Sequence, residues 1–274
     1  MTTIRELMAA ARRRGVERLD AQLLLGDVLG RDRSWLLAHD EAPLAPDQLR
    51  RLEALLARRL DGEPVAYLVG RKEFHGLTLQ VDERVLVPRP DTEVLVDWAL
   101  ELLSGDMRAL PRPDVVDLGT GSGAIALAVK AGCPRADVVA TDVSTGAIEV
   151  ARGNARRLAL EVSFAQGSWW QAVPARRFHL ALSNPPYIAA EDAHLKALHA
   201  EPRGALTPGE SGLEAFDAIV GGSAAALAAG AWLLLEHGFD QADAVSSLLG
   251  RAGFRSISTR TDLAGRPRCT GGRR

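Results

Sequence analysis

An apolar segment runs directly into a glycine-rich turn in Val115-Val116-Asp117-Leu118-Gly119-Thr120-Gly121-Ser122-Gly123. Residues 115–118 have the composition of a buried strand, and residues 124–131 continue as an apolar helix. Glycines let a backbone approach a ligand closely, and a helix N-terminus attracts an anion, which a carboxylate satisfies as well as a phosphate. The spacing differs from Gly-x-Gly-x-x-Gly, which disfavours a dinucleotide. The turn therefore predicts a ligand site formed by Gly119, Thr120, Gly121, Ser122 and Gly123.

Apolar strands and amphipathic helices alternate from this turn to the C-terminus. Regular alternation of this kind predicts an α/β fold, doubly wound, in which helices cover both faces of a mainly parallel sheet. Ligands of such sheets bind at the carboxyl ends of the strands, so further site residues are expected where the neighbouring strands finish. The expected strands are residues 115–118, 138–142, 162–165, 179–182, 231–236, 256–261 and 266–270.

Asp142 and Trp169 each follow a predicted strand of this sheet. An acidic side chain about twenty residues after a glycine-rich turn can accept hydrogen bonds from both hydroxyls of a ribose. Neighbouring side chains of an extended chain point opposite ways, so one of Trp169 and Trp170 can line a cleft while the other packs. Packing of both tryptophans in the core is the alternative. Together with the glycine-rich turn, these residues suggest a ligand that joins an adenosyl group to an amino acid.

A rigid corner follows the strand at residues 179–182, in Ser183-Asn184-Pro185-Pro186-Tyr187-Ile188. Proline has a fixed φ and no N–H, so the carbonyl groups of this corner point in set directions without competing donors. The Asn184 side-chain oxygen and a main-chain carbonyl can accept both protons of a planar amino group, whose flat face Tyr187 can cover. Accepting those protons returns electron density to the nitrogen and favours its attack on an activated methyl group. A plain tight turn is the alternative interpretation.

Apolar residues recur at helical spacing before residue 62. Leucines from Leu49 to Leu60 repeat at three- and four-residue steps after Pro46, and Gly62 is a stop signal. Asp20 is expected to cap an earlier helix. These patterns predict a small helical bundle.

A linker separates this bundle from the α/β region. Residues 62–70 leave the helical pattern, and two short strands around Gly76 predict a β-hairpin. Asp91 or Thr92 is expected to cap the next helix, which runs to about Leu103. The predicted domains are a helical domain at residues 1–62, a linker with the β-hairpin at 63–90, and the α/β domain at 91–274.

Composition excludes several classes of protein. The 274 residues are 47% hydrophobic and 25% charged, which is ordinary for a folded globular chain with a sizeable core. A net charge of -2 argues against a broad nucleic-acid surface. Cys133 and Cys269 lie far apart without ligand-like spacing, so neither a disulfide framework nor a metal site is expected. With no secretion signal and no run of 18 apolar residues, we expect a cytoplasmic protein without a membrane partner.

The pair formed by Asp117–Gly123 and Asn184–Tyr187 resembles the class I S-adenosylmethionine-dependent methyltransferases that act on planar amino nitrogens. Three further stretches, Pro88–Glu93, Gly62–Leu68 and Leu235–Gly238, look like the HemK/PrmC family of peptide chain release factor glutamine N5-methyltransferases. The resemblance implies a seven-stranded Rossmann-like methyltransferase sheet. It also implies methyl transfer to the glutamine of the Gly-Gly-Gln loop of release factors, a protein modification that belongs to translation termination.

Residue roles follow from the resemblance by position. It implies that S-adenosylmethionine is bound by Gly119, Thr120, Gly121, Ser122, Gly123, Asp142, Trp169 and Asn184. It implies that Asn184, Pro185, Pro186 and Tyr187 hold the substrate glutamine, with Asn184, Pro185 and Tyr187 as the catalytic residues and no metal. Adenine N6-methylation of nucleic acid and a non-catalytic module that binds S-adenosylmethionine are the alternatives. The helical domain is expected to dock the release factor, with arginines at residues 12–14 and 58–59 attracting an acidic partner. The alternative is that it only supports the α/β domain.

Overall fold

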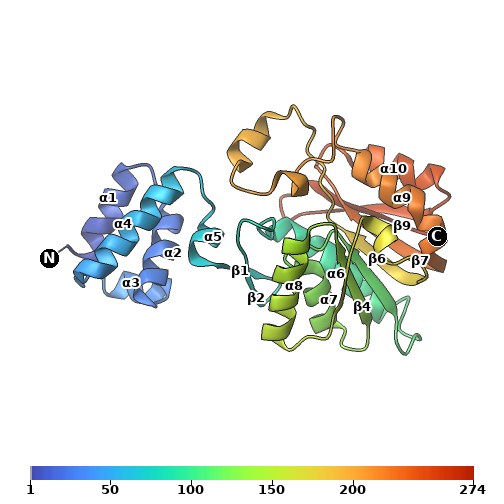
Figure 1. Ribbon diagram of the computed structural model, residues 1–274, viewed down its shortest axis with the longest axis horizontal. Coiled ribbons are helices and arrows are strands. Elements are labelled where there is room, and N and C mark those ends of the chain that lie inside the picture. The colour runs from blue at the N-terminus through green and yellow to red at the C-terminus, as the bar shows by residue number, and fades with distance from the viewer. Residues whose placement is uncertain (1) are drawn as a thin grey trace. The chain divides into compact units, whose positions relative to one another are not determined.

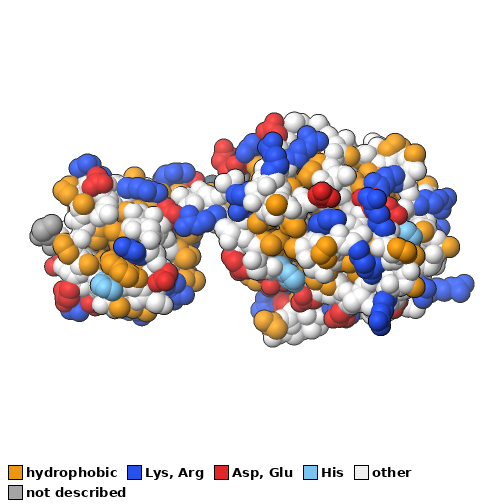
Figure 2. Space-filling model, turned by 90° about the horizontal axis from the view of Figure 1, so that it is seen from below, with side chains coloured by type: hydrophobic (Ala, Val, Ile, Leu, Met, Phe, Trp, Pro, Cys, Tyr) orange, Lys and Arg blue, Asp and Glu red, His pale blue; other side chains and the backbone are white. Residues whose placement is uncertain are grey.

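The computed structural model describes residues 2–274, which fall into two compact units. The helical unit extends to Arg71 and includes Ala197–Ala200, and the sheet unit comprises Lys72–Lys196 and Glu201–Arg274. Both units can be followed in Figure 1. On the face shown in Figure 2, basic and acidic side chains are interspersed rather than gathered by sign. Among residues 2–274, no helix combines the length and apolarity needed to cross a bilayer.

The helical unit packs around leucines. Its helices are α1 (Ile4–Arg13), α2 (Arg18–Leu29), α3 (Arg33–Ala38), α4 (Pro46–Leu60) and α5 (Val65–Val69). Thr3 and Glu6 form a capping box at the start of α1, which satisfies two N–H groups that have no partner within the helix. Leu24, Leu25 and Leu56 lie in a core to which α1 to α5 all contribute. Helical spacing of the leucines is therefore sufficient to build this unit.

Two sequence expectations about this unit were wrong. Helix α2 begins at Arg18, so Asp20 lies inside its first turn and has an ion pair with Arg59 at 2.7 Å instead of capping the helix. Residues 62–70 were expected to leave the helical pattern, but Val65–Val69 form a short helix that ends at Gly70. The left-handed φ of 72° at Gly70 terminates that helix, which is a usual role of glycine.

The sheet unit alternates strands and helices as the sequence predicts. A hairpin of β1 (Arg71–Phe74) and β2 (Leu77–Gln80) precedes it. The helices are η1 (Pro90–Thr92), α6 (Glu93–Ser104), α7 (Ala124–Gly132), α8 (Thr145–Leu158), η2 (Trp169–Ala172), η3 (Ala193–Leu198), η4 (Arg203–Ala205), α9 (Glu214–Ala226) and α10 (Ala242–Arg251), where η marks a 3-10 helix. The strands are β3 (Asp114–Leu118), β4 (Asp137–Asp142), β5 (Ser163–Gln166), β6 (Phe178–Ser183), β7 (Leu227–Glu236), β8 (Arg255–Thr261) and β9 (Pro267–Arg273).

The seven strands form one sheet in the order β5-β4-β3-β6-β7-β9-β8. The first five are parallel, and β9 is antiparallel to both of its neighbours. This confirms the predicted mainly parallel, seven-stranded α/β fold. The chain passes outward from β3 through β4 to β5 and then returns to β6 on the other side of β3. Such a switch point places a crevice at the carboxyl ends of β3 and β6.

Each face of the sheet has its own hydrophobic core. Residues of α6 and α7 pack on one face with Leu180 and Leu182 of β6, and residues of α9 and α10 pack on the other face with Ala181. Figure 1 shows the two helix layers on either side of the strands. Strand β7 begins at Leu227, earlier than the expected residue 231, because it continues directly from the end of α9. The two cores hold the strand ends in fixed positions for the site.

Candidate active site

A cavity of about 430 Å³ opens at the carboxyl ends of β3, β4 and β6. Its size lies within the range of pockets that bind small molecules. Of the residues expected at the site, the cavity is lined by Gly119, Thr120, Gly121, Ser122, Asp142, Trp169, Asn184 and Pro186. The structure thus brings together the ends of three parallel strands that the sequence places far apart. Gly123, Pro185 and Tyr187 are not among the lining residues.

The glycine-rich turn follows β3 and approaches the cavity with its backbone. Gly119 has a φ of 76°, and an added Cβ there would lie 3.3 Å from the Trp169 ring, so only glycine fits. The N–H groups of Gly119 and Thr120 donate to the Thr141 carbonyl at 2.9 and 2.8 Å. These bonds fasten the turn to the end of β4. Gly123, with a φ of 85°, lies behind the turn and begins α7.

Asp142 ends β4 and faces the same cavity. The Gly121 N–H donates to Oδ2 and the Ser144 N–H donates to Oδ1, both at 2.9 Å. Burial raises the pKa of Asp142, while these N–H donors act to lower it. A carboxylate oxygen accepts more than one hydrogen bond, so both oxygens keep a lone pair for ligand hydroxyl groups.

Asp117 braces the turn from inside the protein. The Thr120 hydroxyl donates to its Oδ2 at 2.6 Å and the Ala126 N–H donates to the same oxygen at 3.2 Å. Its Oδ1 is buried and has no hydrogen-bond partner in the described part of the chain. Complete burial raises the pKa of Asp117 to about 7. A buried carboxylate of this kind costs stability, and here it fixes the shape of a ligand-binding turn.

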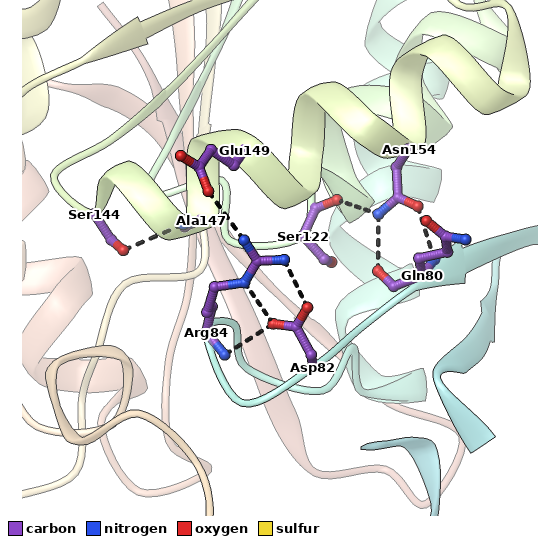
Figure 3. Close-up of polar contacts among 8 residues, drawn as sticks. All are labelled: Gln80, Asp82, Arg84, Ser122, Ser144, Ala147, Glu149 and Asn154. Carbon is purple, nitrogen blue, oxygen red and sulfur yellow. Dashed lines mark hydrogen bonds and ion pairs between the residues drawn. The ribbon is translucent and has the colours of Figure 1, made fainter. Parts of the chain in front are cut away.

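Residues 82–92, which we call the wall segment, form one side of the cavity with Arg84, Val85, Leu86, Pro88, Arg89 and Thr92. Figure 3 shows its attachment near Arg84, which forms an ion pair with Glu149 of α8 at 3.0 Å and another, within the segment, with Asp82 at 2.7 Å. Farther along, Arg89 pairs with buried Glu201, whose Oε2 accepts from the Val87 N–H at 3.0 Å. The wall segment is therefore held at both ends by charged contacts.

Asn154 on α8 connects the hairpin to the glycine-rich turn. Its Nδ2 donates to the carbonyls of Gln80 and Ser122, both at 2.9 Å, and its Oδ1 accepts from the Gln80 N–H at 2.7 Å (Figure 3). Sequence reasoning missed this residue. The available signal was a polar side chain at a position of α8 whose neighbours Ala151 and Ala155 form the buried stripe.

The corner after β6 is fixed by side-chain hydrogen bonds. The Ser183 hydroxyl donates to the Leu118 carbonyl at 2.6 Å, which joins the ends of β6 and β3. Asn184 Nδ2 donates to Thr92 Oγ1 at 3.2 Å, and this orientation leaves Asn184 Oδ1 available to another donor. Thr92 occupies the cap position of α6, as one of the two expected residues, but its side chain forms no cap hydrogen bond and contacts Asn184 instead.

Three aromatic residues in or near the cavity have different surroundings. Trp169 lines the cavity, while Trp170 donates from Nε1 to the Ile219 carbonyl of α9 at 2.7 Å. Tyr187 is packed against the second core, its carbonyl accepts from Gln241 Nε2 at 3.0 Å, and burial raises the pKa of its phenol to about 12. The Tyr187 hydroxyl thus stays protonated at neutral pH.

Several cavity residues were not identified from the sequence. Arg84, Arg89 and Thr92 reach the site from the wall segment, and Gly204 and Ala205 come from η4. Val143, directly after Asp142, also lines the cavity and leaves 71% of its surface exposed. Arg89 and Thr92 lie in the Pro88–Glu93 stretch that carries the family resemblance, whereas Arg84, Gly204 and Ala205 come from segments without strand periodicity.

Family models and known proteins that match this chain all point to one family of methyltransferases. Residues 3–70 match the PrmC N-terminal domain, and residues 93–209 match the methyltransferase small domain. A protein of Bordetella pertussis named release factor glutamine methyltransferase is 51% identical, with 99% of each chain covered. A protein of the same name from Coxiella burnetii is 45% identical, and the match covers 94% of this chain and 92% of that protein. Another from Escherichia coli is 39% identical, and the match covers 98% of this chain and 97% of that protein.

Solved structures with lower sequence identity share the fold. The hMettl16 catalytic domain in complex with MAT2A 3'UTR hairpin 1 matches with a TM-score of 0.59 at 14% identity, covering 86% of this chain and 84% of that chain. The Thermus thermophilus 16S rRNA N2 G1207 methyltransferase, in complex with AdoMet and guanosine, matches with a TM-score of 0.55 at 19% identity. The match covers 74% of this chain and 49% of that chain. At these identities the likeness concerns the fold alone.

Proposed function

This chain belongs to the release factor glutamine methyltransferase family, and we propose that it transfers a methyl group from S-adenosylmethionine to the glutamine side-chain nitrogen of peptide chain release factors. The methyl acceptor we propose is the glutamine of the Gly-Gly-Gln loop. One observation carries the proposal most directly: Asn184 lies on the cavity with its Nδ2 engaged by Thr92, so its Oδ1 is free to accept an amide proton.

We assign the cofactor to the cavity at the ends of β3 and β4. Gly119 to Ser122 would hold the amino-acid portion against their backbone, because the backbone can approach a ligand closely where glycine has no Cβ. Asp142, with lone pairs left on both oxygens, would accept the ribose hydroxyls, and Trp169 would contact the adenosyl group. The half-buried acceptor at Asp142 and the cavity volume both fit a nucleoside-sized ligand.

We assign the amide substrate to the corner after β6. Asn184 Oδ1 and the Pro185 carbonyl accept the two amide protons, which orients the nitrogen lone pair and raises its electron density. Pro186 and Tyr187 would hold the flat face of the glutamine amide. When bound, S-adenosylmethionine supplies a methyl group on a sulfonium, and the electron pair of the C–S bond returns to sulfur as the N–C bond forms. The substituted amide then releases one proton to water, so positioning rather than a strong base drives the reaction.

The proposal is tested with the intact protein, S-adenosylmethionine and a purified release factor. We expect a mass gain of one methyl group, which fragmentation assigns to the glutamine of the Gly-Gly-Gln loop. A release factor with that glutamine replaced by alanine is the control and should gain no mass. Methylation of duplex DNA in place of the release factor would favour adenine methylation, and cofactor binding without any transfer would favour a binding module.

A further inference from the structure

Glu236 is a buried carboxylate to which the mechanism above assigns no role. It ends β7, leaves 2% of its surface exposed, and faces Cys269 of β9 in the strand register. Its Oε2 is buried without a hydrogen-bond partner among residues 2–274. An unpaired carboxylate oxygen in the protein interior is costly, so its retention at the end of a site strand requires an explanation.

Thr92 connects Glu236 to the methyl-acceptor corner. The Thr92 hydroxyl acts on the Glu236 side chain as a hydrogen-bonding group that lowers its pKa, and the Thr92 oxygen accepts from Asn184 Nδ2 at 3.2 Å. Thr92 leaves only 4% of its surface exposed, so water has little access to its hydroxyl. The three side chains therefore form a chain from Glu236 through Thr92 to Asn184, although they come from β7, η1 and the end of β6.

The charge of Glu236 decides the direction of these hydrogen bonds. A carboxylate only accepts, so the Thr92 hydroxyl must donate to it, and the Thr92 oxygen then accepts from the Asn184 amide. In that arrangement Asn184 Oδ1 is directed to the incoming amide. A protonated Glu236 can donate to Thr92 instead, which frees the Thr92 proton for Asn184 Oδ1. The Asn184 side chain can then turn over and present its NH₂ group, which cannot accept a substrate proton.

We propose that Glu236 and Thr92 are positioning residues that hold Asn184 in its acceptor orientation, an inference that rests on the function proposed above. The ionised carboxylate of Glu236 fixes the direction in which the Thr92 hydroxyl donates. The Thr92 oxygen then accepts from Asn184 Nδ2, which leaves Asn184 Oδ1 facing the substrate. Glu236 does not line the cavity, and Thr92 lines it beside Asn184. Replacing Glu236 should therefore change turnover while leaving cofactor affinity intact.

The arrangement predicts a pH dependence. Burial raises the pKa of Glu236 to about 7, the negative Asp91 raises it as well, and Thr92, Arg268 and Arg89 oppose that rise. Arg268 pairs with Asp91 at 2.8 Å and with Asp262 at 2.9 Å. Tyr187 and Cys269 are further titratable groups near Glu236, and His237, the next residue, is buried with its pKa lowered by that burial. Asn184 is held in its acceptor orientation while Glu236 is ionised, so kcat should fall as the pH drops through about 7.

Kinetics at saturating S-adenosylmethionine and release factor form the first test. Thr92→Val keeps the shape and removes the hydroxyl, and should lower kcat on the order of 10- to 100-fold at pH 8, whereas Thr92→Ser should restore most of it. The dependence of kcat on pH tests the role of Glu236. Glu236→Gln cannot change charge, so the loss of kcat near pH 7 should disappear from its pH profile.

The control variant is Cys269→Ala, which alters the residue opposite Glu236 and should keep the wild-type pH profile of kcat. An unchanged kcat in Thr92→Val, or an unchanged acid limb in Glu236→Gln, would overturn the proposal.

A second measurement needs no methyl acceptor and so separates this proposal from the function itself. In ¹⁵N-labelled protein, the Asn184 side-chain NH₂ signals are identified by their loss in Asn184→Ala. We expect their shifts to titrate near pH 7 in the wild type and in Cys269→Ala, and to stay constant in Thr92→Val and Glu236→Gln. The absence of that titration from wild-type protein refutes the orientation mechanism, even where release-factor methylation is observed. Its presence in protein that fails to methylate release factor leaves the orientation mechanism standing and refutes only the function.

Discussion

The helical unit and the sheet unit use charged side chains in opposite ways. In the helical unit, Arg14 pairs with Glu53 and Arg5 with Asp40 at the surface, and Gln22 is the one buried polar side chain among residues 2–71. In the sheet unit, Asp117 and Glu236 are wholly buried, and each has an oxygen without a partner in the described chain. Surface ion pairs contribute little, whereas a buried unpaired oxygen costs free energy. The unpaired oxygens of Asp117 and Glu236 therefore mark two places near the proposed site where the sheet unit gives up stability.

The largest effect of any change in the two units is expected from Asn184→Ala, which removes a polar side chain of the proposed site in the sheet unit. We expect kcat to fall below about a thousandth of the wild-type value, because the amide nitrogen loses the acceptor that orients it. Cofactor affinity and the melting temperature should change little. Mass spectrometry of the release factor measures turnover, and Asn184→Asp serves as the matched variant because a carboxylate keeps an acceptor and should retain some activity. Full turnover in Asn184→Ala would remove this residue from the catalytic step.

Asp142→Ala addresses the cofactor end of the same cavity. Hydrogen bonds to a charged group contribute about 1.5–3 kcal/mol, so the dissociation constant for S-adenosylmethionine should rise on the order of 10- to 100-fold. Titration calorimetry measures this directly. Asn184→Ala is the comparison, and its loss of affinity should be much smaller. Equal affinities for wild type and Asp142→Ala would place the ribose elsewhere.

Charge reversal tests whether the helical unit contributes to binding. Arg12 and Arg13 are exposed on α1, whereas Arg14 is already paired with Glu53. If residues 1–62 dock an acidic face of the release factor, the double variant Arg12→Glu with Arg13→Glu should raise KM for the intact factor about three- to ten-fold at low salt. KM for a peptide with only the Gly-Gly-Gln loop should stay constant. Arg251→Glu, exposed on α10, is the control, and equal KM values for all three proteins would leave the helical unit a buttressing role.

The smallest effect is expected where the helical unit pairs charges at its surface. Arg14 and Glu53 are 38% and 48% exposed, so their attraction is weakened by solvent. Arg14→Ala should change the free energy of unfolding by less than about 1 kcal/mol, as measured by urea denaturation. Leu24→Ala, in the core of the same unit, should cost about 2–5 kcal/mol. A larger loss of unfolding free energy in Arg14→Ala than in Leu24→Ala would contradict the small contribution that we assign to surface ion pairs.

The sequence alone predicts the parts of the molecule in which local pattern and tertiary position agree. The run from Val115 to Gly123 is apolar and then glycine-rich, so strand, turn and helix follow from composition, and the two prolines after Asn184 end β6. Parallel topology then places Asp142 and Asn184 at the same edge without any further information.

The remaining errors and omissions come from contacts between distant segments. Asp20 has the local pattern of a helix cap, but Arg59, far along the chain, provides an ion pair that the pattern does not show. Thr92 also fits a cap locally, and only the fold brings it to Asn184. Asn154 and Glu236 matter because of what surrounds them in the folded chain, which periodicity cannot report.

The attachment of the wall segment has a kinetic consequence. Near its start, Arg84 and Glu149 are 44% and 62% exposed, so dissolved ions compete for that contact. Toward its end, Glu201 is shielded from solvent and holds both Arg89 and the Val87 N–H. The segment should therefore detach first at Arg84 and pivot about Glu201. Higher ionic strength would then shorten the residence time of a nucleoside in the cavity by opening its exit, without weakening the contacts that the nucleoside makes inside.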